Sequence, residues 1–158
     1  MSASPKMPSE DPEQVREEHA DAVLAGTQVI GSLIAESISR VEQEVTMPQL
    51  RVLMLAASQA PLNLLTVAAD LGVHPSNATR TCDRLVRAGL LDRRTSTRDR
   101  RHLALSLTPA GRRLVERVLR FRRQRVVQLL ERMAPDDRTD LVRSLAALAE
   151  AAQPEAED

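Results

Sequence analysis

The middle of the chain carries helix and strand signals in an order that few folds can satisfy. A short helical segment over residues 66–71 ends at Gly72, a common helix stop. Pro75 then opens a second helix that runs to Ala88, and Gly89 is its natural C-terminal stop. Two short helices joined by a tight turn that contains glycine form a helix-turn-helix pattern.

Two extended segments follow this pair of helices. Residues 90–95 can form one strand, and Leu103, Leu105 and Leu107 alternate with smaller residues as in a half-buried strand. The segment between the two, TSTRDRR at residues 95–101, is polar and basic. Two strands around a basic loop, placed directly after a helix-turn-helix, predict a winged helix.

Further helices are predicted on the N-terminal side. From residue 13 to 45, apolar residues recur at spacings of three and four, which indicates one long amphipathic helix. Another helix starts near Thr46, with Pro48 in its first turn, and ends before Pro61. The short piece that follows, residues 62–64, is expected to be extended.

The C-terminal side is helical as well. Thr108 and Pro109 open a long helix that Pro135 interrupts, and a last helix follows. Both ends of the chain thus carry more apolar helix surface than one small lobe can cover, so helices of a second copy are expected to cover it. The predicted regions are a disordered tail (1–12), an N-terminal dimerisation helix (13–45), a winged helix-turn-helix lobe (46–108), C-terminal dimerisation helices (109–152) and an acidic tail (153–158).

The formal net charge is zero, but the charges are unevenly spread. Residues 80–125 hold fifteen arginines and four acidic residues, whereas residues 1–50 and 126–158 are both acidic. A charge run is more often only a solvated helix face. Here it coincides with the second helix of the pair, the wing and the helix after the wing. Arginine offers a planar fork that suits phosphates and guanine edges, so this basic centre favours nucleic acid as the partner.

The second helix of the pair separates cleanly into two sides. The inward side carries Ala78, Cys82, Leu85 and Gly89 at helical spacing. The outward side is entirely polar, with Ser76, Asn77, Arg80, Thr81 and Arg84. Arginine can pair with guanine and asparagine with adenine in the major groove, so this helix is predicted to be a recognition helix.

Residues 46–108 resemble the MarR family of bacterial transcription regulators. The matching pieces are TMPQLRVLMLAAS, LTVAADLGVHPSNATRTCDRLVRAGLLDRR and the wing RDRRHLALSLTPAG. The wing is the most specific, because it matches the family pattern D-x-R-x-x-x-L-x-L-T-x-x-G at Asp99, Arg101, Leu105, Leu107, Thr108 and Gly111.

The resemblance implies a homodimer that binds a pseudo-palindromic double-stranded DNA operator, in most cases as a repressor. It implies that the recognition helix enters the major groove through Ser76, Asn77, Thr79, Arg80 and Arg84. In the wing, Arg101 is implied to enter a minor groove, with Asp99 orienting it and with Arg98 and Arg100 on phosphates. It further implies a small lipophilic effector between the dimer helices and the lobe. Because the chain has no Tyr or Trp to sandwich an aromatic ring, aliphatic side chains and methionines, such as Met47, Met54 and residues of the first helix, are expected to line that pocket.

Several single residues remain open to two interpretations. Cys82 lies on the inward side of its helix, which predicts a core residue, and the alternative is a redox switch. His74 is expected to cap its helix, and His102 either contacts a phosphate or faces solvent. Arginines 112–125 are expected to pair with acids such as Glu13, Glu17 and Glu18 of the first helix or with acids of the C-terminus, mostly across a dimer.

Other functions find little support in the sequence. No catalytic pair and no glycine-rich phosphate loop occur at local spacing, so we expect neither an enzyme nor a cofactor. One cysteine and three scattered histidines do not support a metal site. A winged helix that binds protein is the main alternative, and the polar helix face and basic wing argue against it. No run of about 18 apolar residues and no signal peptide are present, so no membrane span and a cytoplasmic location are expected.

Overall fold

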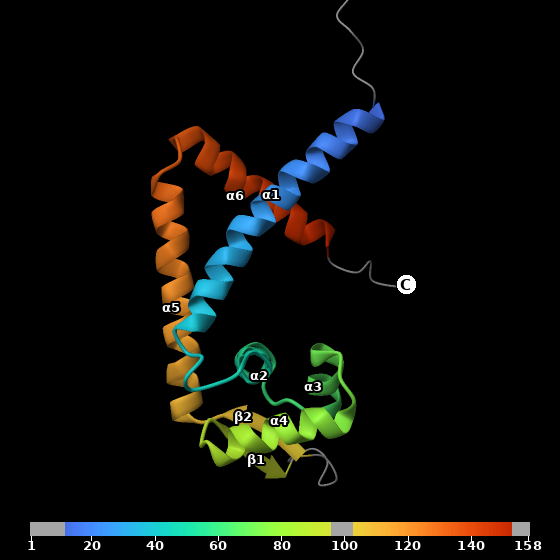
Figure 1. The fold of residues 1–158 in the computed structure, drawn as a ribbon, viewed down its shortest axis with the longest axis vertical. Coiled ribbons are helices and arrows are strands. Elements are labelled where there is room, and N and C mark those ends of the chain that lie inside the picture. Colours follow the sequence, from blue (N-terminus) through green and yellow to red (C-terminus); the bar gives the residue numbers. More distant parts are fainter. Residues whose placement is uncertain (1–11, 96–102, 153–158) are drawn as a thin grey trace, which may run out of the picture.

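A computed structural model of the chain describes residues 12–95 and 103–152. The described elements are α1 (Pro12–Ser39), α2 (Met47–Gln59), α3 (Leu64–Leu71), α4 (Pro75–Arg87), β1 (Leu91–Thr95), β2 (Leu103–Leu107), α5 (Pro109–Glu131) and α6 (Pro135–Ala151). Figure 1 shows α2, α3, α4 and the two strands gathered into one lobe, from which α5 leads away and α6 turns back. We call this group the lobe, and α1 and α6 the arms. The predicted mostly helical winged helix with a small β-wing is confirmed.

The lobe has a continuous core to which every one of its layers contributes. Its largest fully buried side chains are Leu53 of α2, Leu85 of α4, Leu91 of β1, Leu105 of β2 and Leu114 of α5. Because α5 enters this core through its first turns, the lobe and the helix that leaves it form one packed unit.

Local signals explain where the lobe helices begin and end. The backbone N–H of Thr46 donates to the side chain of Gln49 at 2.8 Å, which fixes the start of α2 as a capping box does. The third helix begins at Leu64, two residues before the predicted start, because Asn63 caps it by accepting from the N–H of Thr66 at 2.8 Å. Gly72 ends that helix in the left-handed conformation, with φ of 64°.

The wing stem is an antiparallel hairpin in which Leu91 pairs with Leu107 and Arg93 with Leu105. Leu62 forms an isolated bridge to β2, because it exchanges two backbone hydrogen bonds with Leu105 at 2.8 and 3.0 Å. The strands predicted on either side of the wing are thus confirmed. The extended piece predicted at residues 62–64 is confirmed at Leu62 and wrong at Leu64, because Asn63 caps α3 and Leu64 is its first residue.

The start of α5 is the tightest junction in the lobe. Thr108 caps α5 by accepting from the N–H of Gly111 at 3.0 Å, and its hydroxyl donates to the carbonyl of Gly89 at 2.6 Å. The Thr108 N–H also donates to the carbonyl of Leu90 at 3.1 Å. A Cβ on Gly111 would lie 2.1 Å from that same carbonyl oxygen. The leucine-threonine-glycine pattern of the sequence therefore joins the turn after α4, strand β2 and helix α5.

The first helix ends earlier than the sequence predicted. It stops at Ser39, where the prediction extended it to residue 45. Val41 and Val45 are buried at 3% and 4% exposure, but hydrogen-bonded turns hold them: Val41 N–H donates to Ile38, and Val45 N–H donates to Val41. Apolar spacing reports which side chains face the core, and a turn can keep that spacing after the helix has ended.

The arms are poorly covered within one protomer. Helix α6 has no buried residue, and α1 exposes large apolar side chains such as Val23, Leu24 and Ile30. The stretch Arg16–Ser39 is long and apolar enough to cross a membrane by length and composition alone, which is weak support for a span. The prediction that the chain has no membrane span is therefore not confirmed.

Candidate nucleic-acid interface

Helix α4 is positioned by its inward face. Ala78, Cys82 and Leu85 all have 0% exposure, which confirms the inward side predicted from the sequence. His74 caps the helix as expected, because its Nδ1 accepts from the N–H of Ser76 at 3.3 Å, and Pro75 occupies the first turn. These contacts leave the opposite face of α4 on the surface of the lobe.

Four of the predicted recognition residues form this outward face. Ser76, Asn77, Arg80 and Arg84 are all exposed. Ser76 and Asn77 lie in the first turn, where the helix dipole favours an anion such as a phosphate. Arg80 and Arg84 follow one and two turns later, so a single ridge offers hydrogen bonds to both phosphates and base edges.

The two threonines of α4 are less available than predicted. Thr79 and Thr81 are half-buried, and their hydroxyls donate to the carbonyls of Pro75 and Asn77 at 2.9 and 3.0 Å. Their hydroxyl protons are therefore committed to the helix itself, and only the oxygen remains to accept a hydrogen bond. This leaves the arginines and Asn77 as the main donors of the face.

The sequence analysis missed an ion pair between α4 and the wing stem. Arg93 of β1 donates from Nη2 to Oδ1 of Asp83 at 2.8 Å. On the same helix, Arg87 donates from Nε to the carbonyl of Asp83 at 3.3 Å. The available signal was the alternation of β1, which places Arg93 on the same face as the buried Leu91.

The wing tip itself lies outside the described residues. The predicted contacts Arg98, Asp99, Arg100 and Arg101, together with His102, fall in the segment 96–102. Strands β1 and β2 lead into and out of this segment directly below α4 (Figure 1). These residues remain predictions.

Cys82 behaves as a core residue. Its side chain is fully buried, and burial raises the pKa of the Cys82 thiol to about 11, although the nearby Arg93 charge opposes this shift. A thiol with a raised pKa carries little thiolate at neutral pH, and the thiolate is the reactive form. The core interpretation is therefore favoured over a redox switch.

The arginines of α5 pair with α1 and with the turn that follows it inside one protomer. Arg117 forms an ion pair with Glu44, and Arg125 donates from Nε to Glu36 at 3.2 Å. Arg122 donates to the hydroxyl of the buried Ser37 at 2.9 Å, and burial lowers the pKa of the Arg122 guanidinium. The sequence named Glu13, Glu17 and Glu18 as examples of α1 partners. The partners found in the structure are Glu36 of α1 and Glu44 of the turn after it, because the arginine-rich part of α5 lies beside the end of α1.

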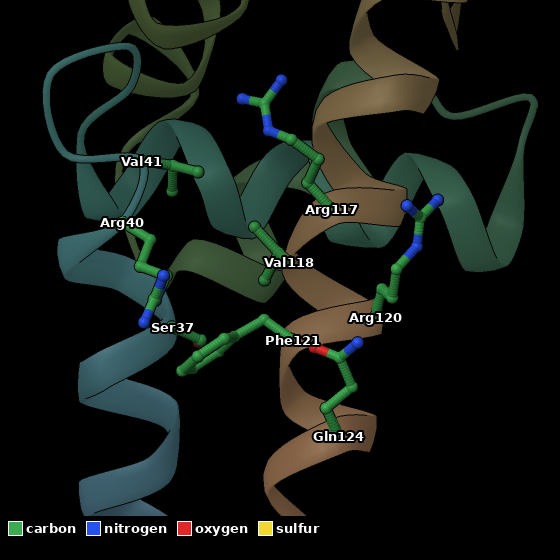
Figure 2. Close-up of a pocket in the computed structure, with 8 residues that line it drawn as sticks. All are labelled: Ser37, Arg40, Val41, Arg117, Val118, Arg120, Phe121 and Gln124. Atoms are coloured by element: carbon green, nitrogen blue, oxygen red, sulfur yellow. The ribbon is translucent and has the colours of Figure 1, made fainter.

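A pocket of about 490 Å³ lies at this contact between α1 and α5 (Figure 2). It is lined by Ser37, Arg40, Val41, Arg117, Val118, Arg120, Phe121 and Gln124. Phe121 points from α5 toward α1, and the guanidinium of Arg40 lies over its ring, 4.3 Å from the centroid. Its wall combines three arginines with Val41, Val118 and Phe121, and neither Met47 nor Met54 lines it. The effector pocket lined by aliphatic side chains and methionines therefore stays a prediction.

Comparisons with known proteins agree with this architecture. Residues 45–103 match the family model described as MarR family. The chain is 33% identical over 112 residues to the HTH-type transcriptional repressor MdtR of Bacillus subtilis, a match that covers 71% of this chain and 72% of MdtR. It is 37% identical to RV1404 from Mycobacterium tuberculosis, whose crystal structure superimposes with a TM-score of 0.78 over 95% of this chain and 100% of that chain. The fold is also that of an S. aureus MepR mutant bound to an oligodeoxyribonucleotide, at 18% identity, a TM-score of 0.61 and coverage of 84% and 98%.

Proposed function

Because this chain belongs to the MarR family of DNA-binding transcription regulators, we propose that it is a cytoplasmic repressor that binds a pseudo-palindromic operator as a homodimer. The observation that carries the proposal is the outward face of α4, where Ser76, Asn77, Arg80 and Arg84 are exposed together on a helix whose other side is buried. The relative MdtR, a transcriptional repressor by name, supports the sign of regulation. The alternative of a protein-binding winged helix has no comparable support.

In this proposal, helix α4 and the wing contact different grooves of the DNA. Arg80 and Arg84 meet base edges in the major groove, where a bidentate arginine distinguishes guanine. Arg101 enters a minor groove and responds to its width, with Asp99 orienting it and with Arg98 and Arg100 on phosphates. The first element supplies base specificity, and the second supplies affinity that depends on shape and salt.

A homodimer is supported by the apolar surface of the arms. Exposed large apolar side chains occur on α1, the second half of α5 and α6; they are Val23, Leu24, Val29, Ile30, Val126, Val127, Leu129, Leu141, Val142, Leu145 and Leu148. Soluble monomers rarely leave so many such side chains exposed on neighbouring helices. A two-fold dimer that buries them places the two copies of α4 about one DNA turn apart, roughly 34 Å.

The pocket beside Phe121 supports an effector that carries negative charge. Among the described residues, neither Arg40, which lies over the Phe121 ring, nor Arg120 has an acidic partner, so the wall of the pocket carries uncompensated positive charge that suits a carboxylate. The lipophilic effector implied by the family resemblance is thus proposed to be an organic anion. Benzoate and its uncharged amide, benzamide, form a matched pair of probes: benzoate is expected to weaken DNA binding and benzamide is not. Equal effects of the two would contradict an anion site.

The experiment that tests the main proposal is selection of bound sequences from random DNA duplexes, followed by titration of the selected operator at several salt concentrations. Arg84→Ala is expected to cost about 1–3 kcal/mol per half-site and to relax the preference at one base position. Arg101→Ala is expected to weaken every operator variant by a similar factor and to flatten the slope of log K against log salt by about one unit per protomer.

The matched control is Arg143→Ala, because Arg143 is an exposed arginine on the α6 arm. It is expected to leave operator affinity unchanged. A wild-type chain that shows no salt-dependent binding to duplex DNA would contradict the proposal and favour a protein partner.

A further inference from the structure

Arg93 occupies an unusual place for a charged side chain. Side chains alternate along a strand, so Arg93 shares a face with Leu91, which is only 2% exposed and belongs to the core. In the hairpin Arg93 lies opposite Leu105, and Leu105 also bonds to Leu62. Arg93 is therefore the middle residue of β1, on the strand face that it shares with the buried Leu91, where an apolar residue is the usual choice.

Among the described residues, its guanidinium has one ionic partner, Asp83. Nη2 donates to Asp83 at 2.8 Å, whereas Nε is buried without a hydrogen-bond partner. The Arg93 charge also acts on the Cys82 thiol, where it opposes the rise in pKa that burial causes. Burying an N–H without a partner is costly. The structure accepts this cost while the guanidinium is held at Asp83.

Asp83 is itself unusual for the surface of a basic helix. It lies three residues after Arg80 and directly before Arg84, so an acidic group interrupts the run of residues proposed to face DNA. A carboxylate at such a position repels phosphates unless a cation neutralises it. The pair Asp83–Arg93 neutralises this charge and at the same time joins the recognition helix to the wing stem.

Packing alone does not require this pair. Leu85 of α4, Leu91 of β1 and Leu105 of β2 are almost completely buried and already hold the sheet under the helix. The two ionic side chains remain 27% and 42% exposed, and ion pairs of that exposure contribute little to the stability of a fold. The Asp83–Arg93 pair adds a directional hydrogen bond that joins the recognition helix α4 to the wing stem at one position.

We propose that Asp83 and Arg93 form a positioning clamp that fixes the β1–β2 hairpin on α4, so that the recognition helix and the wing engage one half-site as a rigid unit. This inference rests on the proposed DNA-binding function. In the proposed arrangement neither residue touches DNA, and both act by positioning the wing. The contribution of Arg101 to DNA binding is the readout of that position.

The test uses the full-length chain and the operator selected from random duplexes. Asp83→Asn removes a negative charge from a DNA-facing helix, a change that by electrostatics alone strengthens binding. The clamp predicts the opposite sign: Asp83→Asn and Arg93→Gln each weaken binding about tenfold, and Arg93→Lys, which keeps the charge, recovers part of the loss. In an Arg101→Ala background, neither substitution is expected to weaken binding further, because the wing contact that they position is already gone.

The matched control is the pair Arg51–Asp70, which has the same 2.8 Å separation and joins α2 to α3 away from the wing. Asp70→Asn is expected to leave affinity within twofold. Unchanged or tighter binding by Asp83→Asn would overturn the clamp, and so would losses that add to that of Arg101→Ala. A wild-type chain that binds no duplex would overturn the proposed function, and the clamp with it.

Discussion

The lobe and the arms contain similar apolar residues, but they differ in what covers them. In the lobe, Leu53, Leu85 and Leu105 have 0% exposure, whereas Leu145 and Leu148 of α6 are 44% and 53% exposed. The lobe therefore obtains its stability from contacts within one protomer. The arms cannot, since burial of apolar side chains is the main source of helix stability in proteins and α6 buries none. This difference is what the proposed homodimer predicts, since a second copy of the chain would cover the arms.

The largest effect is expected at the junction of the lobe with α5. A Cβ added by Gly111→Ala would meet the carbonyl oxygen of Leu90 at 2.1 Å, and this oxygen cannot move without breaking its bond from the N–H of Thr108. We expect Gly111→Ala to destabilise the lobe by about 3 kcal/mol or more. Urea unfolding followed by circular dichroism measures this loss. A change below about 1 kcal/mol would show that the junction is looser than its geometry indicates.

The next effect tests the arms directly. Leu145→Glu places a charge on the exposed apolar face of α6, and we expect it to convert the dimer to a monomer while the lobe stays folded. Light scattering measures the mass, and circular dichroism measures the helix content. Leu53→Ala is the contrasting variant in the lobe core, expected to cost about 2–5 kcal/mol without a direct effect on assembly. A Leu145→Glu protein that remains dimeric would place the dimer interface elsewhere.

The sequence predicted the lobe well for the same reason that the lobe is stable. Its signals are local: proline and glycine mark the ends of α4, Gly72 ends α3, and alternating leucines mark β2. Each signal is a property of a few adjacent residues, so the order of elements and the two faces of α4 could be predicted without knowing the fold. The end of α1 could not, because Val41 and Val45 keep a helical spacing while turns hold them against the core.

The parts that were missed depend on residues distant in the sequence. Arg93 and Asp83 are ten residues apart and meet only because β1 folds back under α4. The pocket brings together Arg40, which precedes the lobe in the sequence, and Phe121, which follows it. The expectation of methionines came from composition, and composition does not show which side chains meet in the fold. The wing residues Arg98, Asp99, Arg100 and Arg101 lie outside the described part of the chain, so their role remains a prediction.

A smaller effect is expected in the pH dependence of the stability of the lobe, which contains the buried Cys82. Burial raises the pKa of the Cys82 thiol from 9.0 to about 11. Between these values the folded lobe keeps the thiol proton and the unfolded chain loses it, so the unfolded state binds fewer protons and stability falls as pH rises. This contribution is fully present below pH 9 and is lost by about pH 11, at roughly 2 kcal/mol.

The chain has no tyrosine and a single lysine, Lys6, so few other groups titrate in this window. Cys82→Ala is expected to lower stability by about 1 kcal/mol at neutral pH, because it leaves a small void, and to flatten the fall between pH 9 and 11. Urea unfolding at several pH values measures both. An equally steep fall in Cys82→Ala would assign the alkaline loss to other groups.

The smallest effect is also expected from a glycine-to-alanine substitution, but in α1 this change should increase stability, whereas at Gly111 it should decrease it. Gly26 lies inside α1, and a Cβ built on it meets nothing within 4 Å in the protomer. Because glycine in a helix interior is less favourable than alanine by roughly 0.5–1 kcal/mol, Gly26→Ala should increase the helix content and thermal stability of the arm. Gly31→Ala, also in open space, serves as the matched variant. If either substitution instead weakens the dimer, a helix of the second copy approaches α1 closely at that glycine, and the open space of the protomer is filled in the assembly. The arms would then resemble the lobe in this respect. A backbone atom of the second copy would require glycine in α1, just as the carbonyl of Leu90 requires glycine at position 111.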